Sequence, residues 1–481
     1  MKYRTLIHTM GNILTVEGVV MIIPLLFALI YKEPTSAHAF GVTIIFALLL
    51  GFLLTRVKKE NRPIVAKDGF IIVTLSWTIM SLVGALPFVI SGSIPSYLDA
   101  VFETLSGFST TGSTIINDIE ALSNSILFWR SFTHWLGGMG ILLFMLAFLP
   151  MKGESTIHLL RAESPGPKVS KIVPRMKDTA ILLYVIYCAL TLALFVLLWA
   201  GGMPFFDSVI HAVSTAGTGG YSLKNSSIAY YNSDYITWVI TTFMFLFGIN
   251  FNVYFLIIMK RAKEAFKISE IKHFLFIFFG AILAITLNIW KMYGSFYTAL
   301  KYSAFSVATM MSTTGYAVVD FDLWPGFSKI ILVSLMFVGG CAGSTSGGMK
   351  VSRLALMFTA AKANLKKMAN PRSVQIIKVD GKIVNPAVIN DCFGYLVFYV
   401  VLMVLSMFIV SLDNFDFQTT TTAVISAINN VGPGLGGVGP TCNFANFSNL
   451  SKLVFCIDML AGRLEIMPVV IFLLPGTWKK Y

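Results

Sequence analysis

A short segment that recurs four times constrains the fold of this chain more than any other feature. It is an apolar run that ends in small, mostly hydroxyl-bearing residues around a glycine, and its copies lie at residues 105–114, 215–221, 311–316 and 428–434. The central glycines are separated by 107, 96 and 117 residues and are Gly112, Gly219, Gly315 and Gly432. This spacing predicts four diverged repeats of roughly a hundred residues each.

The composition places these repeats in a membrane. Of the 481 residues, 56% are hydrophobic and only 12% are charged, whereas soluble domains carry about 25% charged residues. The five cysteines have no metal-ligand spacing, so neither a zinc site nor a disulfide framework is expected. We predict an all-α polytopic membrane protein with about ten full spans, each near the 20 residues that cross a bilayer. The expected spans are 11–31, 38–56, 69–91, 126–150, 179–202, 235–259, 273–293, 327–362, 387–412 and 450–475.

Four shorter apolar pieces precede the glycine segments and predict re-entrant half-helices. Each has only about 12 to 14 residues, too few to cross the hydrocarbon core. Irregular backbone at membrane depth is tolerated only where it is buried in protein or lines a wet cavity. Each repeat is therefore expected to run span, half-helix, loop, span, with the four loops around a central pore. The half-helices are expected at Leu98–Ser109, Phe205–Ala216, Ala299–Ser312 and Phe417–Asn429.

This pattern divides the chain into an N-terminal part and four repeats. Residues 1–60 form a transmembrane hairpin without a glycine loop, for which peripheral packing is the simplest role. The four pore repeats are expected at 61–152, 153–262, 263–372 and 373–481, the third with an intramembrane loop.

The distribution of charge predicts the orientation in the membrane. The formal net charge is +13, and 28 of the 36 Lys and Arg residues fall in six clusters. By the positive-inside rule these clusters, and with them both termini, face the cytoplasm. Acidic residues gather in the other connections, where they would concentrate cations near a pore mouth. The bases thus indicate a membrane protein with a basic cytoplasmic face, in contact with lipid and with no nucleic-acid partner. The clusters are 1–4, 56–67, 152–177, 260–272, 350–382 and 478–481.

The glycine loops supply the expected ion ligands. Glycine reaches backbone conformations closed to other residues, so carbonyl groups can turn toward one axis, where they replace the water around a monovalent cation. The loops contain no Asp, Glu or Lys, which argues against a divalent-cation or anion pore. Potassium is therefore the expected transported ion, and no bound cofactor is expected. The predicted filter residues are Thr110, Thr111, Gly112, Thr218, Gly219, Thr314, Gly315, Val431 and Gly432.

The eighth expected span contains a glycine-rich interruption. About twelve helical residues precede it and rise roughly 18 Å, past the middle of a hydrocarbon core of about 30 Å. Five glycines and three hydroxyl residues cannot hold a stable helix, so the segment could cross the pathway as a movable gate; a static packing kink is the alternative. The predicted gate is Gly339, Gly340, Cys341, Ala342, Gly343, Ser344, Thr345, Ser346, Gly347 and Gly348, closed by Lys350.

Arg463 is the one base well inside the last expected span, where a charge costs about 2.5–3.5 kcal/mol. One hypothesis makes it a positive barrier to the ion just beneath the filter. The alternative is a structural pair with Glu465 or Asp458. Arg130 is expected to be structural.

Together these residues resemble the Trk/Ktr/HKT superfamily of potassium transporters over nearly the whole chain. Besides the four glycine loops, the resemblance rests on Trp129-Arg130-Ser131, Trp135-Leu136-Gly137-Gly138-Met139-Gly140, Gly248-Ile249-Asn250-Phe251-Asn252, 339–348, 430–436 and Gly462-Arg463-Leu464-Glu465. The N-terminal hairpin favours the TrkH branch over the shorter KtrB branch.

The resemblance implies several further properties, the first of which is a place in the bacterial cytoplasmic (inner) membrane. It implies a homodimer with a pore in each subunit, and a cytoplasmic TrkA-like ring of nucleotide-binding subunits that docks on the basic inner loops and controls the gate. It associates a glycine at position 112 with preference for potassium, and a serine there with sodium transport. It also carries the intramembrane gate onto 339–348 and the pore arginine onto Arg463.

The sequence therefore predicts gated potassium uptake through four carbonyl-lined loops, regulated by a cytoplasmic nucleotide-binding subunit. The alternative is a secondary transporter that couples potassium to sodium or protons. Such a transporter would use membrane carboxylates as a relay, and the spans contain few beyond Glu17, Asp458 and Glu465. An enzyme is not expected, because the histidines His134 and His211 have no nearby nucleophile and acid.

Overall fold

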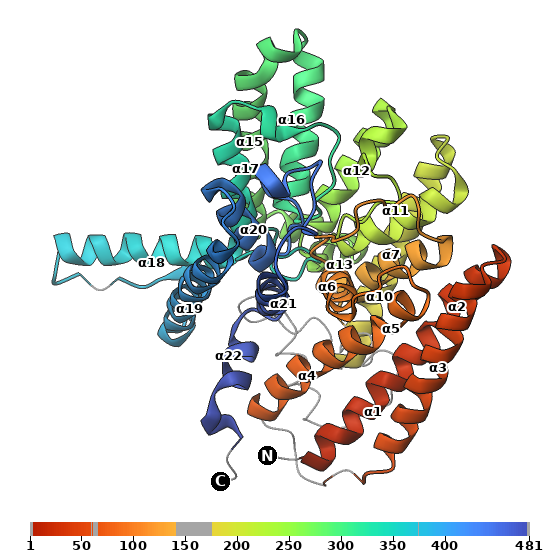
Figure 1. The fold of residues 1–481 in the computed structure, drawn as a ribbon. Helices are drawn as coiled ribbons and strands as arrows, with labels where there is room; N and C mark the ends of the chain where they lie inside the picture. Colours follow the sequence, from red (N-terminus) through yellow and green to blue (C-terminus); the bar gives the residue numbers. More distant parts are fainter. Residues whose placement is uncertain (1–2, 59, 61–65, 141–175, 374, 479–481) are drawn as a thin grey trace.

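The computed structural model describes residues 3–58, 60, 66–140, 176–373 and 375–478, and these are almost entirely helical (Figure 1). Within this part of the chain, six helices are long and apolar enough to cross a membrane, or seven if one bent pair counts as a span. The strands found there are β1 (Lys378–Val379) and β2 (Lys382–Ile383), which pair as an antiparallel hairpin.

The N-terminal hairpin consists of three helices, α1 (Tyr3–Val20), α2 (Ile22–Ile30) and α3 (Pro34–Thr55). The first span starts earlier than expected, because α1 begins at Tyr3. Glycines let α1 and α3 approach closely: a Cβ on Gly51 would lie 2.5 Å from Thr15 Oγ1 and 2.9 Å from the Gly11 carbonyl oxygen. Small residues at such crossings are typical of membrane helices, where close packing drives association.

The four repeats follow in order around the molecule (Figure 1). The first contains α4 (Ala66–Gly84), α5 (Leu86–Ile90), α6 (Tyr97–Phe108) and α7 (Asn124–Gly138). The second contains α10 (Met176–Ala200), α11 (Phe205–Gly217), η1 (Ser227–Tyr231), α12 (Asp234–Phe247), α13 (Phe251–Ile258) and α14 (Ala262–Ala265). The third contains α15 (Ser269–Tyr293), α16 (Phe296–Met311), η2 (Phe321–Leu323), α17 (Gly326–Val338) and α18 (Val351–Ala369). The fourth contains α19 (Pro386–Val410), η3 (Ser411–Asp413), α20 (Phe417–Asn429), η4 (Gly436–Val438), α21 (Asn449–Arg463), α22 (Met467–Leu473) and η5 (Pro475–Thr477).

The half-helices form where short apolar pieces were predicted, as α6, α11, α16 and α20. Three of them begin at a side-chain cap, since Ser96, Ser295 and Asp416 each accept a hydrogen bond from the backbone N–H three residues later. Such caps satisfy amide groups that the first helical turn leaves free. Each half-helix then ends at its glycine loop, so the carbonyl ends of all four are directed at the loops.

In repeats 2, 3 and 4 the second span is not a continuous helix. This corrects the prediction for 235–259 and 450–475, whereas the interruption of 327–362 was expected. Helices α12 and α13 meet at 91°, α17 and α18 are separated by a loop, and α21 is separated from α22 by residues with positive φ at Glu465 and Ile466. The expected span 126–150 begins as α7, and its part beyond residue 140 lies outside the described residues. Hydropathy missed the breaks in repeats 2 and 4 because the residues in them, 248–250 and 464–466, are mostly apolar or small.

Two apolar cores hold the repeats together in pairs. One is formed mainly by the N-terminal hairpin and repeats 1 and 4, and the other mainly by repeats 2 and 3. Residues 3 and 478 lie at the same end of the molecule (Figure 1), where the Tyr3 hydroxyl is 3.4 Å from the Trp478 carbonyl oxygen.

Substitution of Gly51 by valine is expected to lower the melting temperature in detergent, because the added side chain overlaps α1 and overpacking costs about 1–3 kcal/mol. The matched control is Gly41→Val in the same helix, where a Cβ meets no atom within 4 Å. Equal melting temperatures for the two variants would contradict the packing described for α1 and α3.

Candidate ion pathway

The four glycine loops share one backbone conformation. Each half-helix ends at a residue in the left-handed region, with φ between 54° and 58°, and two residues later a glycine has φ between 75° and 101°. The residue between them donates its N–H to the carbonyl five residues earlier, at 2.8–3.1 Å in every loop. The equivalent triplets are Thr110-Thr111-Gly112, Thr218-Gly219-Gly220, Thr313-Thr314-Gly315 and Asn430-Val431-Gly432.

This equivalence corrects the register predicted for the second loop. The sequence pairs Thr218-Gly219 with Thr111-Gly112, but the backbone places Gly219-Gly220 there. Gly219 has no room for a side chain, because a Cβ would lie 2.2 Å from the His134 ring. The missed signal is the spacing of a threonine two residues before the glycine, which three of the four loops share.

The left-handed glycines bring the loops into contact as a closed cycle. A Cβ on Gly112 would lie 1.9 Å from the carbonyl oxygen of Gly219, and one on Gly220 would lie 1.8 Å from that of Thr314. A Cβ on Gly315 would lie 2.3 Å from the Val431 oxygen, and one on Gly432 would lie 2.8 Å from the Thr111 oxygen. Each loop therefore presents a backbone carbonyl to the glycine of another, and the four oxygens form a ring.

Side-chain hydroxyl groups stabilise the first and third loops by hydrogen bonds to other protein groups. Thr111 Oγ1 lies 2.7 Å from Ser109 Oγ and accepts a hydrogen bond from Asn430 Nδ2 at 2.9 Å, which links the first loop to the fourth. Thr314 Oγ1 lies 2.7 Å from Ser312 Oγ. These side-chain hydroxyls are engaged with protein groups, so the backbone oxygens are the better candidates for ion ligands.

A buried ion pair fixes the first loop against the second. Arg130 and Glu103 are 2% and 1% exposed, and Arg130 Nε lies 2.5 Å from Glu103 Oε1. The guanidinium carbon of Arg130 lies 3.6 Å from the centre of the Tyr221 ring, and the Tyr221 hydroxyl donates to the Glu103 carbonyl at 2.9 Å. Arg130 is thus structural, as expected, whereas no local pattern indicated its partners Glu103 and Tyr221.

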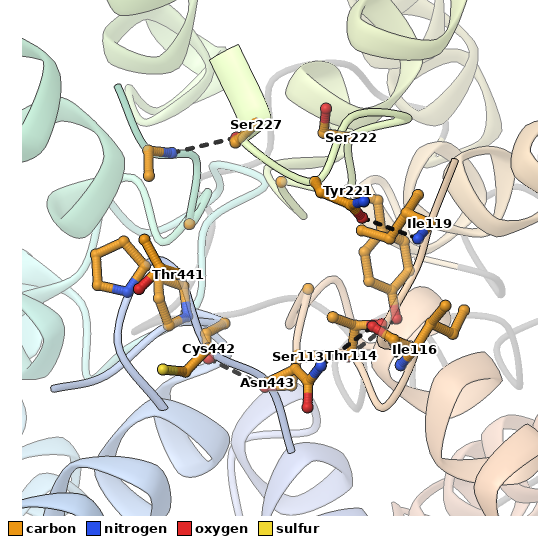
Figure 2. Close-up of a pocket in the computed structure, with 18 of the residues that line it drawn as sticks. Ser113, Thr114, Ile116, Ile119, Tyr221, Ser222, Ser227, Thr441, Cys442 and Asn443 are labelled. Carbon is orange, nitrogen blue, oxygen red and sulfur yellow. Dashed lines mark hydrogen bonds between the residues drawn. The ribbon is translucent and has the colours of Figure 1, made fainter. Parts of the chain in front are cut away.

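A cavity of about 160 Å³ opens onto the loops, and all four repeats line it (Figure 2). Gly112, Gly220, Gly315 and Gly432 lie at its lining together with hydroxyl and amide groups. Lys224, also in the lining, donates to Glu120 at 3.0 Å, and this hydrogen bond raises the pKa of Lys224. The cavity gives a cation access to the glycine loops past side chains that are mostly uncharged.

The predicted gate segment lies directly against the ends of the half-helices. The N–H of Gly347 donates to Thr313 Oγ1 at 2.6 Å, and a Cβ on Gly347 would lie 2.3 Å from the Asn429 carbonyl oxygen. The segment therefore contacts both the third and the fourth glycine loops. We call residues 339–350 the intramembrane loop.

The intramembrane loop also fills the break between α12 and α13. Cys341 N–H donates to the Gly248 carbonyl at 2.9 Å, and Phe251 N–H donates to the Gly343 carbonyl at 3.0 Å. Lys350 is buried, and its ammonium group donates to the Ser346 carbonyl. Backbone groups that the broken helix leaves free are thus satisfied by the loop.

Arg463 binds carbonyl groups from two elements. Its Nη1 donates to Thr345 in the intramembrane loop at 2.8 Å, and its Nη2 donates to Gly138 at 2.8 Å and to Gly137. The last two carbonyls belong to the C-terminus of α7, where the helix dipole favours a positive charge. The carboxylates considered as partners bind elsewhere: Glu465 pairs with Arg353 at 2.8 Å, and Asp458 accepts from Ser406 at 2.7 Å.

This geometry is that of a membrane transport protein built around re-entrant loops. A ring of backbone oxygens can replace part of the water around a monovalent cation. Among the described residues, no group of three or more His, Cys, Asp or Glu side chains is placed to bind a metal ion.

The chain belongs to the TrkH family of cation transport proteins, whose model matches residues 33–477. It is 34% identical over 486 residues to "Trk system potassium uptake protein TrkH" of Salmonella typhimurium, covering 100% of both chains. It is 32% identical to "Trk system potassium uptake protein TrkG" of Escherichia coli, covering 99% of each. The crystal structure of the potassium transporter TrkH from Vibrio parahaemolyticus matches with a TM-score of 0.89 at 33% identity and full coverage of both chains. The family resemblance and the assignment as a transport protein are thereby confirmed.

The register of the second loop can be tested with glycine variants. Gly219→Ala and Gly220→Ala are both expected to lower thermal stability and cation flux, because each Cβ overlaps existing atoms. Adding His134→Ala should restore stability and flux to Gly219→Ala, because the new Cβ clashes with the His134 side chain. It should not restore them to Gly220→Ala, because that Cβ clashes with the Thr314 backbone. Equal rescue of both variants would favour the register predicted from the sequence.

Proposed function

We propose that this chain forms a gated pathway for potassium uptake across the bacterial cytoplasmic membrane. The observation that carries the proposal is the closed cycle of contacts between four glycines and four backbone carbonyls. In the corrected register the ion ligands are Thr111-Gly112, Gly219-Gly220, Thr314-Gly315 and Val431-Gly432. The four half-helices direct the partial negative charge of their C-termini toward this ring, which favours a cation there. Relatives across the full length are named potassium uptake proteins, which supports potassium as the ion.

The intramembrane loop is the proposed gate, and Arg463 is its proposed latch and a barrier to the ion. The loop contacts the third and fourth glycine loops, and the guanidinium joins it to the end of α7. Movement of the loop away from the ring would require these hydrogen bonds to break. The positive charge of Arg463 near the pathway would also repel a passing cation.

The proposal extends to the assembly of the chain and to its regulation. The chain would form a homodimer, and a cytoplasmic nucleotide-binding ring similar to TrkA would dock on basic inner segments. Helix α18 projects from the body of the molecule (Figure 1) and exposes Lys362, Lys366 and Lys367. It also exposes apolar side chains such as Phe358 and Met368. These features support protein contacts along α18.

Coupling to protons or sodium remains the competing function. It would use carboxylates along the pathway, but Glu465 is paired with Arg353 and Asp458 is hydrogen-bonded to Ser406. Glu17 lies in the N-terminal hairpin, against Gly84 of α4. Uptake in liposomes should therefore follow the potassium gradient alone, and dependence on an imposed proton or sodium gradient would favour the coupled transporter.

Gly112→Ser is expected to weaken discrimination between potassium and sodium. The Cβ would overlap the Gly219 carbonyl, and φ at this position is 81°, so the ring must widen. Competition of sodium with rubidium uptake in liposomes measures the effect, and Gly326→Ser, where a Cβ meets no atom within 4 Å, is the control. Unchanged selectivity in Gly112→Ser would remove the loops from the filter.

Shortening the intramembrane loop by several residues is expected to raise flux in the absence of any regulatory subunit. Arg463→Ala should act in the same direction by at least roughly tenfold, since even one hydrogen bond to a charged group contributes about 1.5–3 kcal/mol and tenfold corresponds to about 1.4 kcal/mol. Both effects are measured as rubidium uptake by the purified protein in liposomes. Loss of folding in the shortened protein, with unchanged flux in Arg463→Ala, would identify the loop as a static kink.

A further inference from the structure

Glu270 connects the two ends of the intramembrane loop. It is the second residue of α15 and is 8% exposed. Its Oε1 accepts hydrogen bonds from the backbone N–H of Ala342 at 2.6 Å and of Ser352 at 3.2 Å. One carboxylate oxygen thus joins the beginning of the loop to the helix that follows it.

Glu270 also caps that helix from outside. Ser352 is in the first turn of α18, whose own N-cap residue, Lys350, makes no side-chain cap hydrogen bond and has φ of 72°. A helix N-terminus leaves backbone N–H groups free and carries a partial positive charge. The carboxylate supplies the missing acceptor together with the favourable charge.

The first turn of α15 is held in turn by the β1–β2 hairpin. Its N-cap residue, Ile268, cannot accept a hydrogen bond through its side chain, and the N–H of Ser269 donates instead to Asp380 Oδ1 at 2.8 Å. Asp380 and Gly381 form the two-residue turn of the hairpin, with φ of 49° and 77°. Such a turn requires positive φ at both positions, so the hairpin geometry fixes where Asp380 lies.

The hydrogen bond from Ser269 to Asp380 and those that Glu270 accepts involve adjacent residues of α15, and together they connect the hairpin to the intramembrane loop. Ser269, which Asp380 holds, is the neighbour of Glu270, which holds the loop. The hairpin end of the path is open to solvent: Asp380 is exposed, and Ile383 in β2 is 68% exposed. A displacement of the hairpin therefore acts on the first turn of α15 and, through Glu270, on both ends of the loop.

We propose that Glu270 and Asp380 are positioning residues of the gate, and that movement of the β1–β2 hairpin is transmitted through them to the intramembrane loop. The inference rests on the proposed function of that loop. It identifies the hairpin as the place where a cytoplasmic signal enters the membrane domain.

Cys341 provides a readout of loop position that does not depend on transport. Its side chain is 0% exposed within the loop, so a water-soluble maleimide reacts with it only when the loop moves. The experiment uses the full chain in liposomes, with Cys188, Cys392, Cys442 and Cys456 replaced by serine. Glu270→Gln keeps the side-chain shape but removes the charge, and charge-assisted hydrogen bonds are roughly twice as strong as neutral ones.

Glu270→Gln is expected to accelerate labelling of Cys341 about tenfold, which corresponds to about 1.4 kcal/mol. Asp380→Asn should accelerate it as well, and the double variant should not exceed the larger single effect, because both act along one path. Asp391→Asn, an exposed carboxylate on α19, is the matched control and should label at the unsubstituted rate. Labelling of Glu270→Gln at that same rate overturns the proposal. Additive effects of the two substitutions would show that Glu270 and Asp380 do not act in series, which also contradicts it.

Rubidium flux in the same liposomes separates this inference from the gate itself. If shortening the intramembrane loop raises flux while Glu270→Gln and Asp380→Asn leave it unchanged, the gate is correct and the connection through Glu270 is wrong. If shortening the loop does not change rubidium flux, the loop is not the gate and the proposed function is contradicted at that point. Should Glu270→Gln not fold, Asp380→Asn and Asp380→Ala still decide the question, because Asp380 is exposed.

Discussion

The contact between a glycine in one loop and a backbone carbonyl in another is the constraint on which the rest of this structure depends. It occurs four times and closes into a cycle. Each contact needs a residue without a Cβ and with positive φ, so the four positions admit glycine and little else. The half-helices, their caps and the buried pair of Glu103 with Arg130 all act to bring the loops to this common place.

A contact of the same kind, between a glycine and a backbone carbonyl, also positions the intramembrane loop. Gly347 approaches the Asn429 carbonyl and binds Thr313, so backbone proximity packs the intramembrane loop together with the buried side chains of Cys341 and Met349. Such packing holds the loop through a few hydrogen bonds with Thr313, Arg463, Glu270 and Gly248. In the proposed gate, these hydrogen bonds would break when the loop exchanges between two arrangements.

Much of this architecture could be predicted from the sequence because it is local. The half-helix before each loop, the N-terminal hairpin and the interruption at 339–348 are visible as apolar length and glycine content. The register of the second loop was predicted wrongly because Gly219 and Gly220 are adjacent and only the threonine two residues earlier marks Gly220. The reason for Gly219 is the ring of His134, which is distant in sequence. The breaks at Gly248 and Glu465, and the bonds of Glu103 and Glu270 to distant backbone groups, likewise arise from tertiary contacts that no local pattern records.

The central claim is that the four carbonyls bind a partly dehydrated alkali cation. Anomalous diffraction from crystals grown in rubidium locates such an ion directly. The account predicts a rubidium peak enclosed by the oxygens of Thr111, Gly219, Thr314 and Val431, and its loss or displacement in Gly220→Ala. Rubidium found only in the outer cavity, or at side-chain carboxylates with none at the ring, would contradict it.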